Sequence, residues 1–247
     1  MAISMTHKTK GIVLRSVKYG ETSLVVTIFT ELFGVQTYLV NGVRSAKKSS
    51  AKANLFQSAA ILNLVVYHNN QKSMQRIKEF EWAVLYQQVL SDVIKNSIAL
   101  YMVELLHKCL KQPEQHTDLF YFFEDVLLQL DKSNKAVTAN MPLYFALQLT
   151  HFFGFKMNDA YDESNCIFDL QEGNFIAEAP HHKNFIEGEY ALLLSQLLKV
   201  MHPDELQEFK LHHENRRKLL SACHEYYALH LPDFGTLKTM MVLQDVL

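Results

Sequence analysis

Four cations within nine residues form the strongest chemical signal in the sequence. The other five residues of the stretch are serines and alanines, whose small side chains let the long cationic ones reach outward. Lysine and arginine bind phosphates, and serine hydroxyls can donate hydrogen bonds to phosphate oxygens. The pattern therefore predicts contacts with a nucleic-acid backbone, the alternative being a loop whose charges are only solvated. The four cations are Arg44, Lys47, Lys48 and Lys52.

The charge around this segment is one-sided. Residues 1–80 contain eleven lysines and arginines against three acids, a net charge of +8, whereas residues 81–247 contain 13 against 23, a net charge of −10. No Asp or Glu occurs between Glu31 and Glu79. Such asymmetry favours a polyanion as partner of the first part of the chain. Three further cations there, which neighbouring strands could bring to the same surface, are Arg15, Lys72 and Arg76.

Linear motifs for catalysis and metal binding do not occur in the sequence. The eight glycines form no GxGxxG, GxxxxGK(S/T) or GxSxG pattern. His224 begins an HExxH pattern, but Ala228 stands where the second histidine belongs. The three cysteines include no CxxC pair, which argues against a disulfide framework and fits a reducing compartment. We therefore expect no catalytic residue, no cofactor and no metal ion.

The composition is that of a globular protein. Of the 247 residues, 49% are hydrophobic and 20% charged. No secretory signal is visible, and no run of about 18 apolar residues occurs. We expect a soluble, cytoplasmic protein.

The first part of the chain reads as short strands. They are expected at residues 11–17, 22–30, 35–40, 59–67 and 73–80, and five strands in so short a segment predict a small closed or nearly closed barrel. Among the nearby aromatic residues, Tyr19 and Tyr38 are slightly favoured for stacking on bases, because tyrosine tolerates a half-exposed position.

The period of the apolar residues becomes helical after Trp82. An irregular, acidic insertion is expected at residues 158–188. The chain is thus predicted to be a multidomain α+β protein, with a barrel at 1–82 and an all-α domain at 83–247. Helices are expected at residues 94–109, 119–130, 142–153, 189–200, from 203, 214–231 and 236–246.

Several short motifs follow one another in the first 45 residues. They are GIVLR at 11–15, YGETSL at 19–24, TIFT at 27–30, Gly34 and NGVRS at 41–45. Weaker helical motifs occur at 100–106, 145–155 and 237–239. This order resembles the RecO family of bacterial recombination mediators over nearly the whole chain, although Asn41 stands where that family usually has lysine.

The resemblance implies an N-terminal OB-fold, a helical C-terminal domain and a non-enzymatic role in DNA repair. Family members bind single- and double-stranded DNA, anneal strands covered by the single-stranded-DNA-binding protein SSB, and work with RecR to load RecA at the nucleoid. The helical domain is then expected to hold a groove for the acidic, apolar C-terminal tail of SSB. Candidate cations for its rim are Lys108, Lys111, Arg216, Arg217 and Lys218.

Many members of that family carry two CxxC pairs in the insertion and bind zinc there. This chain has only Cys166 in that stretch, so we predict no structural zinc. Apolar residues are expected to hold the insertion instead, namely Ile167, Phe168, Phe175 and Ile176.

Two other interpretations stay open from the sequence. One is a different OB-type module that binds RNA or single strands and carries a helical partner domain. The other is an enzyme whose site lies between the two halves. Competition between single-stranded DNA, duplex DNA and RNA separates the first of these from a recombination mediator.

Overall fold

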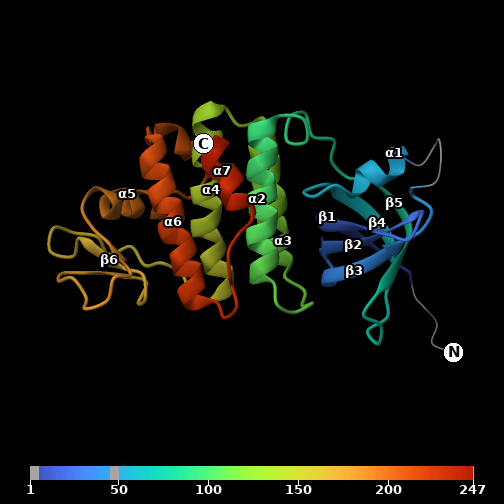
Figure 1. Cartoon of the computed structure of the whole chain (residues 1–247), viewed down its shortest axis with the longest axis horizontal. Helices are drawn as coiled ribbons and strands as arrows, with labels where there is room; N and C mark the ends of the chain where they lie inside the picture. The colour runs from blue at the N-terminus through green and yellow to red at the C-terminus, as the bar shows by residue number, and fades with distance from the viewer. Residues whose placement is uncertain (1–5, 45–49, 247) are drawn as a thin grey trace. The chain divides into compact units, whose positions relative to one another are not determined.

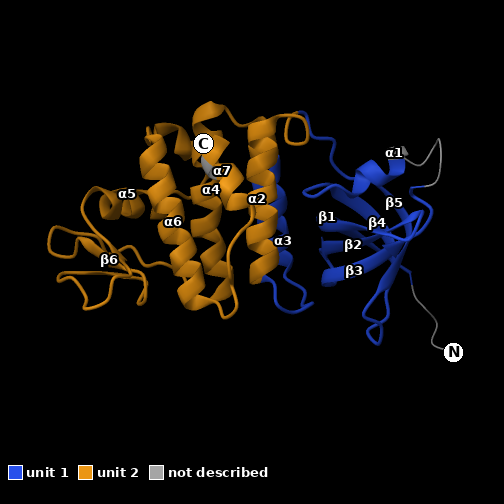
Figure 2. Cartoon of the chain, viewed as in Figure 1, with its two compact units in different colours: residues 1–87, 110–128 blue, residues 88–109, 129–247 orange. Residues whose placement is uncertain are grey.

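The computed structural model describes residues 6–44 and 50–246, which form two compact units (Figures 1 and 2). Unit 1 contains residues 1–87 and 110–128, and unit 2 contains residues 88–109 and 129–247. The sequence placed the domain boundary at residue 82. In the structure, residues 83–87 and the segment 110–128 group with the first unit.

Unit 1 is built on a five-stranded barrel, as the sequence predicted. The strands follow the closed order β1-β2-β3-β5-β4, in which only β3 and β5 are parallel. Two short helices, α1 (Ser50–Ala53) and η1 (Asn54–Phe56), connect β3 to β4. This connectivity is that of an OB-fold. The strands are β1 (Thr6–Tyr19), β2 (Ser23–Thr30), β3 (Gly34–Val40), β4 (Ile61–Tyr67) and β5 (Gln75–Trp82).

The barrel closes because the 14-residue strand β1 pairs with both β4 and β2. Its register shifts between Val13 and Arg15, and a bulge of this kind bends a strand. Gly11 lies at the crossing, where a Cβ atom would overlap the side chains of Ile28 and Leu64. Alternate residues fill the interior, among them Leu24, Val26, Ile28, Tyr38, Val40, Leu62, Leu64 and Val66.

The segment 110–128 packs on the barrel and contains the first turns of α3 (Thr117–Lys132). The ring of Phe120 lies 5.5 Å from that of Phe29. The Lys10 Nζ atom donates to both carboxylate oxygens of Glu124, at 2.8 and 2.9 Å. Gly34 has a φ of +61°, and a Cβ there would collide with the main-chain carbonyl of Glu114. Apolar packing, an ion pair and this close approach together attach the segment to unit 1.

Unit 2 is organised around α4, which contacts α2, α5, α6 and η3 and buries side chains on all sides. Figure 1 shows α2, α4 and α6 running side by side. The elements of this unit are α2 (Val93–Cys109), α4 (Lys135–Leu149), η2 (Thr150–Phe153), α5 (Glu189–Leu198), η3 (Pro203–Glu208), α6 (His213–His230) and α7 (Thr239–Val246).

Two predicted helix starts were wrong. The helix expected from Pro142 begins seven residues earlier, at Lys135, where the Asn134 side chain accepts a hydrogen bond from the Val137 N–H at 3.0 Å. Burial on all sides of α4 outweighs the hydrogen bond that the internal proline removes. The last helix begins at Thr239 rather than Thr236. The Glu104 carboxylate of α2 caps it by accepting from the N–H groups of Lys238 and Thr239.

The sequence predicted an irregular insertion at 158–188. The structure instead shows a small antiparallel sheet within it. It consists of β6 (Ile167–Asp169), β7 (Asn174–Ile176) and β8 (Phe185–Ile186), in the order β7-β6-β8. The four predicted apolar residues form its first two pairs, Ile167 with Ile176 and Phe168 with Phe175. The strands are too short to show a periodic pattern in the sequence, which is why they were missed.

Candidate nucleic-acid interface

The alternation that fills the barrel also sets the residues of its outer surface. Val26 and Ile28 of β2 point inward, so Val25 and Thr27 lie outside. Cross-strand pairing extends this outer set over β1, β2, β3 and the start of β5. We call it the β1–β3 face; its members are Arg15, Val17, Tyr19, Val25, Thr27, Thr37, Leu39 and Arg76.

Two adjacent rows of this face contain the two predicted arginines. In one row, Arg15 pairs with Thr27, which pairs with Thr37. In the next, Val17, Val25 and Leu39 are successive partners, and Leu39 pairs in turn with Arg76. The barrel thus brings Arg15 and Arg76, 61 positions apart in the sequence, to one surface.

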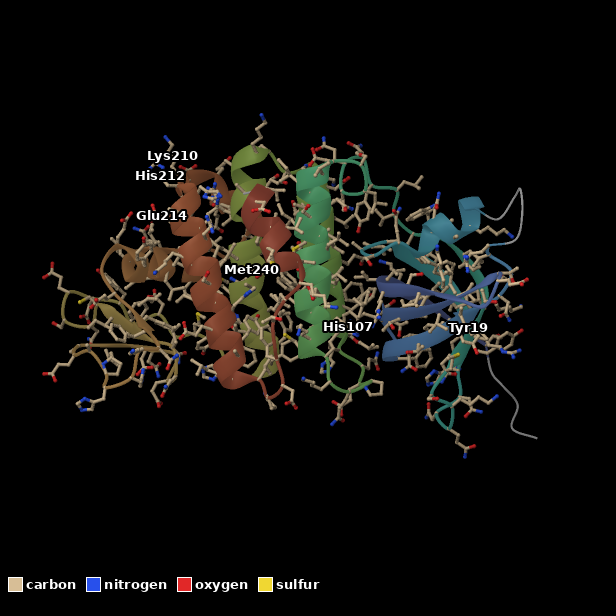
Figure 3. All side chains as sticks on the ribbon, in the orientation of Figure 1. Tyr19, His107, Lys210, His212, Glu214 and Met240 are labelled. Carbon is tan, nitrogen blue, oxygen red and sulfur yellow. The ribbon has the colours of Figure 1, made fainter. Side chains whose placement is uncertain are left out.

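The β1–β3 face is cationic and partly apolar. Arg15 and Arg76 are exposed, and neither forms an ion pair with any residue that the structure describes. Val17 is 44% and Tyr19 57% exposed. None of the eight members is acidic, although Glu21 lies in the adjoining β1–β2 turn. A surface of this type can hold phosphates at its arginines and a base on the Tyr19 ring (Figure 3).

The start of the predicted basic loop is attached to one end of this face. The Arg44 N–H donates to the carbonyl of Thr22 at 3.0 Å, and its Nη1 donates to the carbonyl of Gly20 at 3.1 Å. Lys52 is exposed on α1, so this part of the segment is helical rather than a loop. Lys47 and Lys48 lie outside the described residues.

Lys72 is the third cation that was expected beside the basic segment. It lies exposed in the turn between β4 and β5. The buried side chain of Gln75 holds this turn: its Oε1 accepts from the Asn69 N–H at 3.0 Å, and its Nε2 donates to the carbonyls of Asn69 and Lys72. The turn borders the same cavity as Thr37 of the β1–β3 face. Lys72 is therefore held beside that face by an internal hydrogen-bond network.

The prediction for Tyr38 was wrong. Its side chain is fully buried in the barrel, and burial raises the pKa of its hydroxyl. Tyr38 is on the inward side of β3. Apolar and polar residues alternate imperfectly along this strand, so the sequence did not show which side Tyr38 would take. The sequence also gave no role to His68, whose ring stacks on Phe33 with centroids 3.9 Å apart. A histidine in a polar turn carries no signal for such a contact, because the contact joins two distant turns.

A second outer surface of the barrel has a different charge pattern. We call it the β4–β5 face. There Lys8 pairs with Val65, which pairs with Glu79, and Lys10 pairs with Asn63, which pairs with Glu81. Lys78 forms an ion pair with Glu79 at 3.2 Å, and the amide of Asn63 donates to Glu81. Cations and carboxylates are thus interleaved on this face.

The structure does not gather the five cations proposed for a partner groove. Lys108 donates its Nζ to the carbonyl of Phe234 in unit 2, whereas Lys111 belongs to unit 1. Arg216 donates to the carbonyl of Leu211, and burial lowers the pKa of its guanidinium. Only Arg217 and Lys218 are exposed neighbours, lining a hollow of about 480 Å³ at the start of α6.

Comparisons with known proteins match both units. The family described as "Recombination protein O N terminal" matches residues 4–86, and "Recombination protein O C terminal" matches residues 90–239. A protein of Bacteroides fragilis named "DNA repair protein RecO" is 34% identical over 244 residues, covering 98% of this chain and 99% of the relative. The protein of that name from Flavobacterium psychrophilum is 33% identical over 242 residues, with 98% and 99% covered.

The chain belongs to the RecO family. It is therefore a DNA repair protein with an OB-like barrel and a helical region, as the sequence motifs indicated. RecO proteins are named for repair and not for a catalysed reaction. In the described part of this RecO chain, no three His, Cys, Asp or Glu side chains cluster as metal ligands, and no helix has the length and apolarity to cross a membrane.

An aromatic pair and a buried carboxylate stabilise the insertion. The rings of Phe168 and Phe175 meet at 4.9 Å in an edge-to-face contact. The Asp169 carboxylate accepts from the Gln171 N–H at 2.7 Å and lies 3.3 Å from the His182 Nε2. These contacts tie β6 to β7 and to the loop that precedes β8.

Proposed function

We propose that the protein is a DNA-binding recombination mediator without catalytic activity, and that its β1–β3 face and adjoining basic segment bind the DNA backbone. The observation that carries this proposal is the β1–β3 face itself. It joins two exposed arginines and an exposed tyrosine on a surface without carboxylates. Phosphate contacts supply most of the affinity for DNA, and aromatic rings add stacking without sequence preference.

Strand annealing follows from such a surface. Cations that screen two phosphate backbones lower the repulsion between complementary strands. Backbone contacts carry no sequence information, so the protein binds both strands alike and is displaced as base pairs form. In this role the protein acts at the nucleoid in the cytoplasm on strands covered by SSB, and it works with RecR to load RecA.

For the SSB tail, we propose a site in unit 2 at the start of α6. Arg217 and Lys218 are exposed there, and Lys210 and His212 precede the helix (Figure 3). Unit 2 belongs to the acidic part of the chain, but here Lys210, Arg217 and Lys218 outnumber Glu214, which lines the same hollow. A local excess of positive charge of this kind favours an acidic peptide. Saturable binding of a labelled tail peptide that is lost in Arg217→Ala/Lys218→Ala is the expected result.

The decisive experiment is annealing of complementary strands coated with SSB. We compare the wild type with a variant that has alanine at Arg44, Lys47, Lys48 and Lys52. Loss of four phosphate contacts is expected to abolish annealing and to reduce the slope of log K against log salt by about 2.8 on single strands. A control with the same change in charge has alanine at Lys132, Lys156, Lys183 and Lys238, which are exposed residues of unit 2 outside the proposed tail site. If both variants retain the wild-type salt slope, the basic segment does not bind DNA.

A further inference from the structure

A cavity of about 790 Å³ lies within unit 1, between β3 and the turn that joins β4 to β5. Its lining combines an aromatic pair, several amide side chains and one cation. Among the described residues that line it, none is acidic. The residues used below are Phe33, Gln36, Thr37, His68, Gln71 and Lys72.

The aromatic pair is fixed by its surroundings. The rings of Phe33 and His68 are nearly parallel, with an angle of 12° and centroids 3.9 Å apart. The His68 Nε2 lies 2.6 Å from the Asn70 Oδ1, and the His7 ring meets Phe33 edge-on at 5.2 Å. Both stacked rings are half-buried, so the pair already has the geometry of a stack before a third ring joins it.

Polar groups for a base edge and for a phosphate lie around this pair. The Gln36 Nε2 donates to the carbonyl of Phe33 at 2.8 Å, which orients the amide and leaves its Oε1 as an acceptor. Gln71 is exposed in the turn and offers both a donor and an acceptor. Lys72 supplies a positive charge, and the Gln75 network fixes its backbone.

We propose that this cavity is a nucleobase pocket. A base of single-stranded DNA turns out of the stack of its neighbours and stacks on the Phe33–His68 pair, while an adjoining phosphate lies at Lys72. Thr37 belongs both to the cavity and to the β1–β3 face, so a strand on that face reaches the pocket directly. The inference rests on the proposed DNA binding and adds the point at which the protein holds a base rather than the backbone.

Photo-crosslinking tests the pocket in the full-length protein. An oligothymidine with 5-iodouracil in place of thymine is expected to give crosslinked peptides that contain Phe33 or His68. The same protein is titrated with oligothymidine and with an abasic strand of equal length and charge. His68→Ala should remove the crosslink in the turn and lower the preference for the base-bearing strand by about fivefold. Its salt slope should be unchanged, because no cation is lost.

Two further variants keep the test interpretable. Phe33→Leu preserves apolar packing at the barrel end and should lower the same preference, and His181→Ala, an exposed histidine of unit 2, should leave it unchanged. If the wild type binds both strands but crosslinks only elsewhere, or if His68→Ala retains the full preference, the pocket is refuted and DNA binding stands. If the wild type binds neither strand, the proposed function fails with it.

Discussion

The two outer surfaces of the barrel both carry basic side chains but differ in the residues that surround them. Both include part of β1, and both carry exposed basic side chains. On the β4–β5 face, Lys8 and Lys10 are paired with Val65 and Asn63, which are paired in turn with Glu79 and Glu81. Lys10 also donates a hydrogen bond to Glu124. On the β1–β3 face, Arg15 and Arg76 are in register with Thr27 and Leu39.

The difference shows that a surplus of basic residues does not by itself make a binding surface. A phosphate that approaches the β4–β5 face must displace a carboxylate or tolerate one nearby, whereas on the β1–β3 face it meets only neutral neighbours. Like charge within a few ångströms costs binding energy even in partly aqueous surroundings. On the β4–β5 face Lys10 and Lys78 have carboxylate partners, whereas Arg15 and Arg76 of the β1–β3 face form no ion pair with a described residue and are available to a ligand.

The largest expected effect concerns the contribution of the Lys10–Glu124 ion pair to stability. Lys10→Met leaves Glu124, whose side chain is only 10% exposed, without its cation. We expect a loss of about 2 kcal/mol in the free energy of unfolding, less than for a fully buried pair because Lys10 is 37% exposed. Urea denaturation measures it, with Lys8→Met as control. Adding Glu124→Leu should restore stability, and equal stability of the Lys10 and Lys8 variants would contradict the interpretation.

The next effect concerns the available cations. Arg15→Ala/Arg76→Ala removes two phosphate contacts and should weaken single-strand binding about 25-fold at 0.1 M salt, with the salt slope reduced by about 1.4. Fluorescence anisotropy at several salt concentrations gives both values. Lys8→Ala/Lys78→Ala makes the same change in charge on the β4–β5 face and should cost less than twofold. Equal losses in both variants would abolish the distinction between the faces.

A smaller effect is expected from the exposed ring of the β1–β3 face. Tyr19→Ala should weaken binding of single-stranded DNA about fivefold, because one base loses its stacking partner. The salt slope should not change, since no charge is removed. Tyr19→Phe retains the ring and serves as control; a fivefold loss in this variant too would assign the effect to the hydroxyl instead of stacking.

The smallest effect sharpens the contrast between the outside and the inside of the barrel. Tyr38 lies on β3 next to Leu39 of the β1–β3 face, but it points inward and is fully buried. Tyr38→Phe should therefore leave the affinity for single-stranded DNA within twofold of the wild type. A loss as large as that of Tyr19→Ala, in a variant that melts at the wild-type temperature, would mean that the ring is accessible to bases.

Much of the fold follows from local patterns. The strand β2 has the clearest alternation, with Leu24, Val26 and Ile28 on one side, and it was predicted within one residue of its start. The helix α2 was predicted from apolar residues spaced by three and four positions. By contrast, the capping of α7 by Glu104 depends on a residue 135 positions earlier, and no local signal contains it.

The sequence by itself determined that this protein has a small basic barrel, a helical remainder and the motifs of RecO, because these depend on the order and type of nearby residues. The tertiary structure decided which basic residues remain available. Register across strands sets whether the row of paired residues that contains a cation also contains a glutamate, and it directs Tyr38 inward and Tyr19 outward. It also brings Phe33 and His68 together. Such pairings depend on where the closed barrel places distant residues, which a reading of neighbours along the chain does not reveal.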